Sequence, residues 1–195
     1  MIPLFYLPSY KSFTMPSQRI KVHDKEFEIS IPHEEIQKQV KRIAEEMNRD
    51  LAEKDPIFLG ILNGAFMFAS DLFQQLTFPT QITFLKLASY SGTSSTGSVK
   101  QLIGINMDLK DRVVVVIEDI VDTGVTLDTI IRQLSGYQPK ELIVATFLHK
   151  PDAATRNVKL DYVGITIPND FVIGYGLDYD GYARNYKDLY TVVGE

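Results

Sequence analysis

The sequence has no cysteine, no tryptophan and only three histidines among its 195 residues. Without cysteine the chain can form neither a disulfide nor a zinc site with thiolate ligands. No apolar run reaches the roughly 20 residues that a membrane-spanning helix needs. The histidines, His23, His33 and His149, lack the spacing of a metal-binding motif. We therefore assign them no catalytic role.

Basic residues are outnumbered by acidic ones, 20 to 25, which gives a formal net charge of -5 and a pI near 5.3. This balance argues against a nucleic-acid surface as the main function, so any anionic ligand must be held by local groups. A chain without cysteine fits a reducing compartment. We expect a cytoplasmic protein that binds neither nucleic acid nor membranes.

A chain of this length is expected to form one domain with a substantial core. Residues 2–8 are apolar, but they are interrupted by proline and no basic residue precedes them, so they do not resemble a secretory signal. We expect residues 1–14 to be a flexible extension or the product of a start upstream of Met15. Residues 15–195 would then form the single domain.

Strand-like and helix-like patterns alternate along the chain, which predicts an α/β fold with a mostly parallel sheet and helices on both faces. One helix is marked by apolar residues at helical spacing over 36–51, with Pro32 near its start and Glu34 and Glu35 in its first turn. Strands are expected at 20–22, 27–31, 57–62, 81–88, 99–105, 113–117, 142–148, 162–167 and 171–175, and two further helices at 65–76 and from Val125 onward.

The most informative segment covers residues 113–130, VVVVIEDIVDTGVTLDTI. Its apolar beginning is typical of a strand that is buried on both faces of a parallel sheet. From Val125 the apolar residues follow helical spacing, so the polar stretch between joins a strand to a helix. In open α/β sheets, ligands bind at such junctions.

The polar stretch has two kinds of binding group. Glu118, Asp119 and Asp122 can face hydroxyls, a base or a divalent cation. The backbone N–H groups of residues 122–126, with Gly124 and two threonine hydroxyls, can hold an anion at the start of the helix. A turn that only caps a helix needs one carboxylate, not three. A phosphorylated sugar fits both halves.

The run IEDIVDTGVTL, residues 117–127, resembles the phosphoribosyl-pyrophosphate signature of the type I phosphoribosyltransferases, in the form found in the 6-oxopurine (hypoxanthine-guanine) branch. Four further segments resemble this branch: residues 62–64, residues 89–90, Lys150, and residues 171–179 with Arg184 beyond them. Aspartic proteases also contain Asp-Thr-Gly, but they need a second copy, which this chain lacks.

The resemblance implies the type I phosphoribosyltransferase fold, with a mostly parallel central sheet and a small hood built from N- and C-terminal segments. It implies a purine salvage enzyme that forms IMP from hypoxanthine, and GMP from guanine, with phosphoribosyl pyrophosphate as the second substrate and pyrophosphate as the product. It also implies Mg²⁺ as cofactor and a homodimer or homotetramer.

The resemblance further assigns roles to the residues that match the signature. Asp122 would be the catalytic base at purine N7. The remaining residues would bind the ribose, the 5′-phosphate or the metal: Glu118 and Asp119 the ribose hydroxyls, Thr123, Gly124, Val125 and Thr126 the phosphate, and Glu118, Asp119 and Asp178 the magnesium ion.

Residues outside the signature would bind the base or the pyrophosphate, or would form a lid. The purine would be bound by Lys150, Phe171, Val172 and Asp178. Of these, Lys150 would donate to O6 and Phe171 would stack on the ring. The pyrophosphate would be bound by Leu62, Asn63 and Gly64, with a cis peptide between Leu62 and Asn63, and by Arg184. Ser89 and Tyr90 would open a polar lid at 89–100, and Tyr179 and Tyr182 are expected to pack.

One position departs from the family pattern, and two alternatives remain open. The family often has lysine where this chain has Asn63, which removes a cation from the pyrophosphate site and puts any lysine-dependent role in doubt. A regulatory protein of the same fold that binds nucleic acid is one alternative. A transferase for another base, such as xanthine or a pyrimidine, is the other, although the C-terminal segment favours purines.

Overall fold

The computed structural model describes residues 19–88 and 100–194, and its centre is a six-stranded sheet with the order β5-β4-β3-β6-β7-β8. All neighbouring strands are parallel except the edge strand β5, which runs antiparallel to β4. The strands are β3 (Ile57–Leu62), β4 (Gln81–Ala88), β5 (Lys100–Ile103), β6 (Val113–Val121), β7 (Glu141–His149) and β8 (Tyr162–Thr166). The predicted parallel sheet is confirmed.

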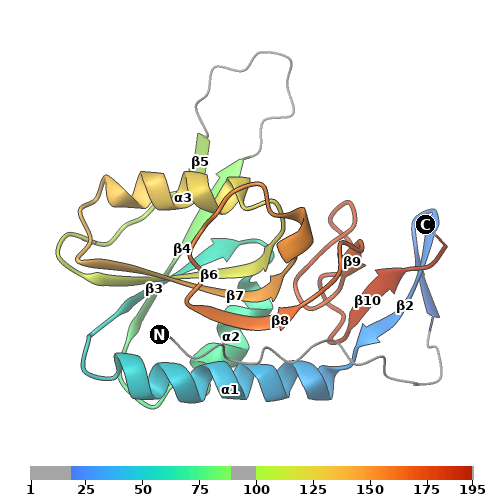
Figure 1. Cartoon of the computed structure of the whole chain (residues 1–195), viewed down its shortest axis with the longest axis horizontal. Helices are drawn as coiled ribbons and strands as arrows, with labels where there is room; N and C mark the ends of the chain where they lie inside the picture. The colour runs from blue at the N-terminus through green and yellow to red at the C-terminus, as the bar shows by residue number, and fades with distance from the viewer. Residues whose placement is uncertain (1–18, 89–99, 195) are drawn as a thin grey trace.

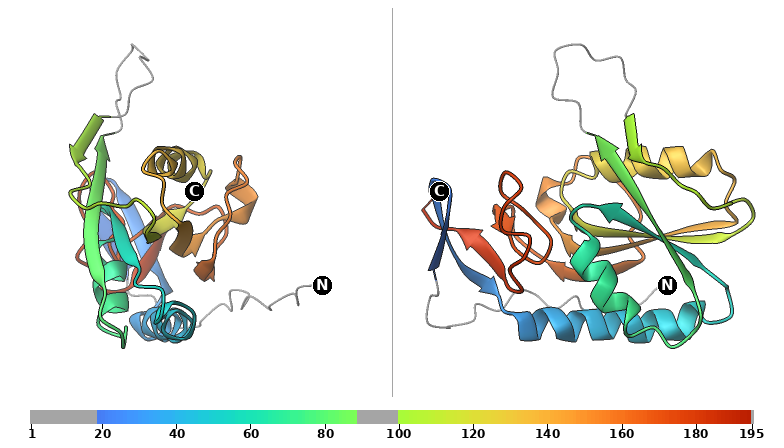
Figure 2. Two further views of the ribbon diagram at one scale, coloured as in Figure 1. Left: turned by 90° about the vertical axis from the view of Figure 1, so that its left-hand side faces the viewer. Right: turned by 180° about the vertical axis from the view of Figure 1, so that it is seen from behind.

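Helices cover both faces of this sheet (Figures 1 and 2). They are α1 (His33–Leu51), α2 (Phe66–Phe73) and α3 (Val125–Ser135). Successive side chains of a strand point to opposite faces. Accordingly Val113, Val115 and Ile117 of β6 pack in the cluster that contains α1 and α2, while Val114 and Val116 pack in the cluster that contains α3. A strand with two covered faces needs apolar residues throughout, as the sequence has.

Helix α1 forms as its apolar spacing predicts. The predicted face is buried, namely Ile36, Val40, Ile43, Ala44, Met47 and Leu51. Pro32 is the N-cap residue, and Glu34 and Glu35 lie in the first turn, where the helix dipole favours negative charge. Among the described residues, no helix is both long and apolar enough to cross a membrane.

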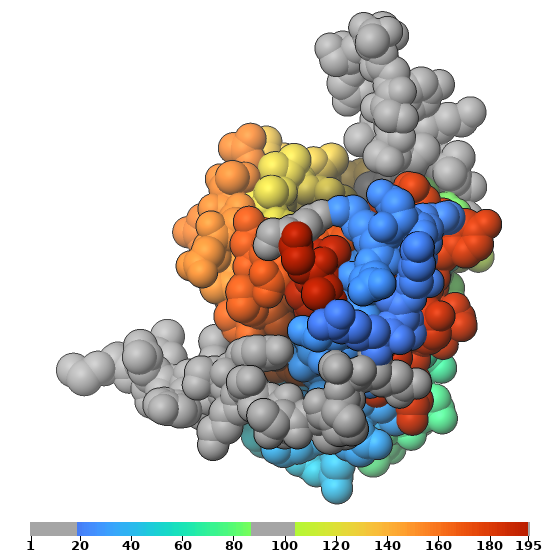
Figure 3. All heavy atoms as spheres, turned by 90° about the vertical axis from the view of Figure 1, so that its right-hand side faces the viewer, coloured from blue at the N-terminus to red at the C-terminus, as the bar shows by residue number. Residues whose placement is uncertain are grey.

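A second, antiparallel sheet forms the hood. Its order is β1-β2-β10-β9, and its strands are β1 (Arg19–Val22), β2 (Lys25–Ile31), β10 (Leu189–Val192) and β9 (Val172–Ile173). The two ends of the described chain therefore lie side by side, with the N-terminal strands in blue beside the C-terminal segment in red (Figure 3). The hood lies beyond the carboxyl ends of the central strands (Figure 1).

Several predicted boundaries were wrong, and two predictions concern residues outside the described ranges. β6 continues to Val121, so Glu118 and Asp119 lie on the strand and not in the turn. α2 ends at Phe73, β9 has two residues and β5 ends at Ile103. Strand β10 was not predicted. The proposed extension at 1–14 and the lid residues Ser89 and Tyr90 lie outside the described residues.

Candidate active site

The signature residues line a pocket of about 280 Å³ at the carboxyl end of β6. The strand ends at Val121, the turn follows, and α3 begins at Val125. Gly124 is the N-cap of α3 and has a left-handed backbone, with a φ of 79°, which glycine adopts without a steric penalty. The lining consists of Ile61, Glu118, Asp119, Ile120, Val121, Asp122, Thr123, Gly124, Thr126 and Leu127.

The start of α3 offers backbone donors to this pocket. The N–H of Val125 donates to Oγ1 of Thr123, two residues earlier, at 3.4 Å. Among the described residues, the N–H groups of Thr123, Gly124 and Thr126 donate no hydrogen bond. The first N–H groups of a helix have no partner within it and carry partial positive charge, so they bind anions well. The geometry fits the predicted 5′-phosphate position.

Asp122 and Lys150 form an ion pair beside these donors. Lys150 Nζ lies 3.1 Å from Asp122 Oδ2, and the lysine side chain is only 8% exposed, against 44% for the aspartate. The lysine follows directly on β7, and its backbone N–H donates to Val121 O at 2.9 Å. A buried cation and a more exposed carboxylate therefore stand next to each other at the pocket.

Glu118 and Asp119 are electrostatically unfavourable in their charged forms. Burial raises the pKa of Glu118 well above its ordinary value, and the neighbouring Asp119 raises it further. Burial also raises the pKa of Asp119, to about 6; Asp178 adds to this, while hydrogen bonds from the backbone and the charge of Arg184 oppose it. Both acids line the pocket, where their oxygens can accept hydrogen bonds from hydroxyl donors. Among the described residues, no group of three or more His, Cys, Asp or Glu side chains could hold a metal ion.

This environment leads to a prediction on stability. The pKa of Asp119 in the folded protein, about 6, exceeds its ordinary value of 3.8. The folded state therefore holds the proton more tightly, and this stabilisation is complete below the ordinary pKa and lost as the pH rises through about 6. The variant Asp119→Asn cannot ionise, so at about pH 8 its free energy of unfolding should exceed that of the wild type by about 3 kcal/mol, and its unfolding temperature should be higher.

The measurement is thermal unfolding of both proteins at about pH 8 and at about pH 4. At about pH 4 the difference between the variant and the wild type should largely disappear. Glu53→Gln, at an exposed position, removes the same charge on the surface and is the control. A lower unfolding temperature of Asp119→Asn at the higher pH would contradict the unfavourable burial of this carboxylate.

Two glycines allow the surrounding loops to approach Asp119. A Cβ atom on Gly64 would overlap the Asp119 carboxylate, and a Cβ atom on Gly176 would overlap the carbonyl oxygen of Gly64. Gly176 has a φ of 99°, and its carbonyl accepts a hydrogen bond of 2.7 Å from Arg184 Nη1. Asp119, the 62–64 loop and the C-terminal segment therefore form one packed unit.

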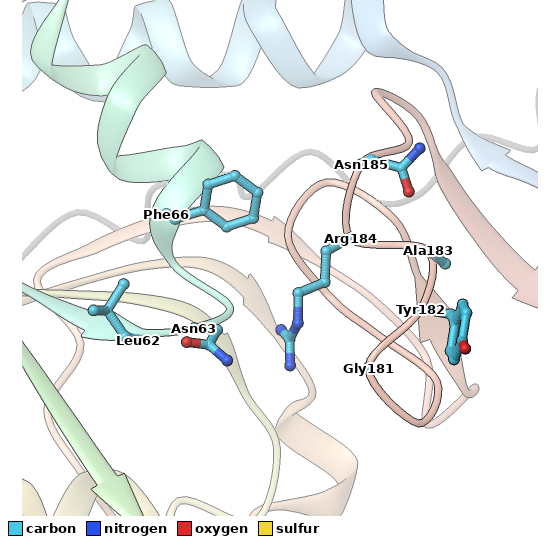
Figure 4. A pocket seen from close by; sticks show the side chains of 8 residues that line it. All are labelled: Leu62, Asn63, Phe66, Gly181, Tyr182, Ala183, Arg184 and Asn185. Carbon is cyan, nitrogen blue, oxygen red and sulfur yellow. The ribbon is translucent and has the colours of Figure 1, made fainter. Parts of the chain in front are cut away.

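A larger pocket, of about 580 Å³, lies between the 62–64 loop and the C-terminal segment. The Arg184 guanidinium projects from one side toward the Asn63 amide on the other (Figure 4). Arg184 also pairs with Asp178 Oδ1, and Asp178 Oδ2 accepts a 2.7 Å hydrogen bond from the N–H of Gly181. The peptide between Leu62 and Asn63 is cis, as the resemblance implies.

Two of the residues predicted to bind the base lie at β9: Phe171 directly precedes this strand and Val172 begins it. Phe171 is 38% exposed, with the rings of Phe27 and Tyr179 at 6.1 and 5.7 Å between centroids. Val172 is buried and pairs with Thr191 of β10. Phe171 is exposed enough to leave part of its ring free for stacking. Val172 is buried, so it can offer a ligand mainly its backbone.

The structure places most signature residues around one pocket and Leu62, Asn63 and Arg184 around the other. The remaining predicted residues of the described chain line neither pocket: Gly64, Val125, Lys150, Phe171, Val172 and Asp178. The structure also adds residues that the sequence did not indicate. Phe66 and Tyr182 line the larger pocket and are 41% and 62% exposed. Tyr182 packs only in part: its ring lies against that of His23 in a T-shaped arrangement, with 4.6 Å between the centroids, and the rest of the side chain is exposed. A large apolar residue two positions after the 62–64 loop was a usable signal for Phe66. No sequence signal distinguished Tyr182.

The comparisons with known proteins agree with this arrangement. The family model of the phosphoribosyl transferase domain matches residues 32–180. A hypoxanthine-guanine phosphoribosyltransferase of Mycobacterium tuberculosis is 42% identical over 163 residues, which are 80% of this chain and 79% of that protein.

Solved structures give the same result. A crystal structure of a hypoxanthine-guanine phosphoribosyltransferase from Bacillus anthracis superposes with a TM-score of 0.79 at 34% identity, covering 85% of this chain and 98% of that one. The hypoxanthine phosphoribosyltransferase of Trypanosoma cruzi superposes with a TM-score of 0.80 at 30% identity, covering 89% and 94%. Each of these proteins is therefore similar to this chain over most of its own length.

Proposed function

Because this chain belongs to the phosphoribosyltransferase family, we propose that it joins 6-oxopurine bases to phosphoribosyl pyrophosphate. The products are IMP from hypoxanthine and GMP from guanine, with release of pyrophosphate, and the function is purine salvage. The fold is the type I phosphoribosyltransferase fold of the similar structures.

The pair of Asp122 and Lys150 is the observation that carries the choice of base. One edge of a 6-oxopurine presents the acceptor O6 next to N7, which carries a proton in one tautomer. An ammonium group can only donate hydrogen bonds and an ionised carboxylate can only accept them. The 3.1 Å contact between the two side chains gives them the spacing to meet O6 and N7–H together. Adenine presents an amino group at position 6, which would oppose the lysine.

The other groups account for the phosphoribosyl substrate. The N–H groups at the start of α3 hold the 5′-phosphate, and Glu118 and Asp119 accept hydrogen bonds from the ribose hydroxyls. Arg184 and the 62–64 loop bind the pyrophosphate in the larger pocket. Asn63 contributes an amide where many relatives have lysine, so Arg184 is the charged group that we assign to this pocket.

The acidic residues fit Mg²⁺ as cofactor. Magnesium usually binds one or two carboxylates together with substrate phosphates. The raised pKa values of Glu118 and Asp119 are those of buried acids whose charge a cation would offset. Since no group of three or more His, Cys, Asp or Glu side chains among the described residues could hold a metal ion by itself, we propose that these two residues and Asp178 would hold it together with the substrate phosphates. When bound, it would offset negative charge on the pyrophosphate.

The chain's own residues then perform the proton transfer. The bond between C1′ and the pyrophosphate oxygen breaks while N9 of the base attacks C1′, and Asp122 takes the proton from N7. Lys150 donates to O6 and so stabilises negative charge that moves onto this oxygen. Phe171 stacks on the base and excludes water from one face of it.

The two alternatives are less well supported. A nucleic-acid-binding regulator does not need the Lys150, Phe171 and Asp178 set, and the similar proteins named above are enzymes. A pyrimidine lacks the imidazole nitrogen that Asp122 would serve. We also propose a cytoplasmic homodimer or homotetramer, by analogy with the family.

The test is turnover of purified protein with magnesium and phosphoribosyl pyrophosphate, with hypoxanthine, guanine, xanthine and adenine supplied in separate reactions. We expect IMP and GMP to form and adenine to be the poorest substrate, because a buried ammonium donor would be left unpaired. Absence of turnover with all three oxopurines would contradict the proposal, and efficient use of adenine would contradict the role of Lys150.

A further inference from the structure

One loop contacts three consecutive residues of the signature. It runs from Lys150 to Arg156 and contains a short 3-10 helix, Pro151–Ala153. Lys150 bonds Val121 through its backbone and Asp122 through its side chain, at 2.9 and 3.1 Å. The far end of the loop bonds the next residue, Thr123. The loop therefore extends from the base-binding lysine to the predicted phosphate cradle, residues 123–126.

Three donors from this far end converge on the carbonyl oxygen of Thr123. They are the N–H of Thr155 at 3.0 Å, the N–H of Arg156 at 3.1 Å and the hydroxyl of Thr155 at 3.2 Å. The loop also packs on the next residue, since a Cβ atom on Gly124 would lie 3.2 Å from the carbonyl oxygen of Arg156. The peptide group between Thr123 and Gly124 is thus held firmly from one side.

The orientation of this peptide group determines where its N–H points. The group is planar and trans, so its C=O and N–H point in opposite directions. Because the C=O of Thr123 points to the 155–156 segment, the N–H of Gly124 points away from it. Within the described part of the chain this N–H has no acceptor. The fixed carbonyl thereby aims a free donor at the anion position.

We propose that Thr155 is a positioning residue for the phosphate cradle. Its hydroxyl, together with two backbone donors, fixes the peptide whose opposite end binds the 5′-phosphate. The side chain is exposed and does not line the pocket of the signature residues, so it acts through Thr123 and not by touching substrate. This inference rests on the proposed function and concerns the phosphate half of the same site.

The test uses two substitutions of Thr155. Thr155→Val removes the hydroxyl and keeps the branched shape, whereas Thr155→Ser keeps the hydroxyl. The control is Ser135→Ala, which removes another exposed hydroxyl that bonds a backbone carbonyl, Ile131 O at 2.8 Å, at the opposite end of α3. Calorimetry compares the affinity for IMP with that for inosine, which lacks the phosphate, and kinetics compares the KM of phosphoribosyl pyrophosphate with that of hypoxanthine.

We expect Thr155→Val to weaken IMP about three- to tenfold, the loss typical of one hydrogen bond, and to raise the KM of phosphoribosyl pyrophosphate similarly. Inosine affinity and the KM of hypoxanthine should not change, and Thr155→Ser and Ser135→Ala should match the wild type. Any of three results would overturn the inference. Thr155→Val could bind IMP as well as the wild type does, it could lose IMP and inosine affinity equally, or Thr155→Ser could lose as much IMP affinity as Thr155→Val. Failure of the wild type to bind IMP would instead overturn the proposed function, and this inference with it.

Discussion

Asp122→Asn is expected to lower the rate of the chemical step by about 10²- to 10⁴-fold, the usual range for a general base. The asparagine has nearly the same shape, and its oxygen can still accept the hydrogen bond from Lys150, which lies 3.1 Å away in the wild type. It cannot take up the proton from purine N7. Substrate affinity should therefore change much less than the rate.

The measurement is a single-turnover reaction with enzyme in excess, because it separates the chemical step from product release. Substitution also removes the negative charge beside Lys150, whose side chain is 8% exposed, so the unfolding temperature should fall and must be measured in parallel. Asp128→Asn is the matched control, since Asp128 lies in the first turn of α3 and pairs with Arg132 on the surface. A single-turnover rate equal to that of the wild type would exclude Asp122 as the base.

Local patterns sufficed for the central sheet and for most of the candidate site. The run of apolar residues in β6 indicates a strand buried on both faces, and the spacing in α1 indicates which face of the helix is buried. Neither pattern depends on distant residues. The signature indicated most residues of one pocket, and the resemblance indicated Leu62, Asn63 and Arg184 of the other. The predicted Phe171, Val172 and Asp178 line neither pocket. The residues of the first pocket could be predicted because most of them are consecutive along one unit, β6, the following turn and α3.

Features that depend on partners far along the chain could not be predicted. Glu118 was expected in a turn because it is acidic, yet it continues β6 because it pairs with Thr146 of β7. Strand β10 has only four residues and exists through its pairing with β2, more than 150 residues earlier. The raised pKa values of Glu118 and Asp119 likewise come from burial by other elements. Pairing and burial of this kind leave no mark in a local window.

The contact between Gly64 and Asp119 also joins distant parts of the chain, and it explains why a glycine ends the 62–64 loop. The Asp119 carboxylate occupies the space of a Cβ atom on residue 64. The loop cannot retreat, because its carbonyl oxygen lies directly against Gly176, which in turn binds Arg184 at 2.7 Å. A methyl group at position 64 must therefore displace either the carboxylate or the segment that carries Arg184.

Gly64→Ala is accordingly expected to lower kcat/KM by on the order of 10²-fold, because a displacement of about 1 Å in a catalytic site has consequences of this size. Steady-state kinetics with hypoxanthine measures the loss, and a crystal structure of the variant should locate the shifted carboxylate. The control is Gly60→Ala in β3, the strand that leads into the 62–64 loop, where the new Cβ atom would lie 2.8 Å from the ring of Phe84 and away from the acids. That variant should unfold at a lower temperature yet keep its kcat/KM. If Gly64→Ala retained wild-type kcat/KM with Asp119 unmoved, the close contact would have no role in placing the carboxylate, and the packed unit of Asp119, Gly64 and Gly176 would be only structural.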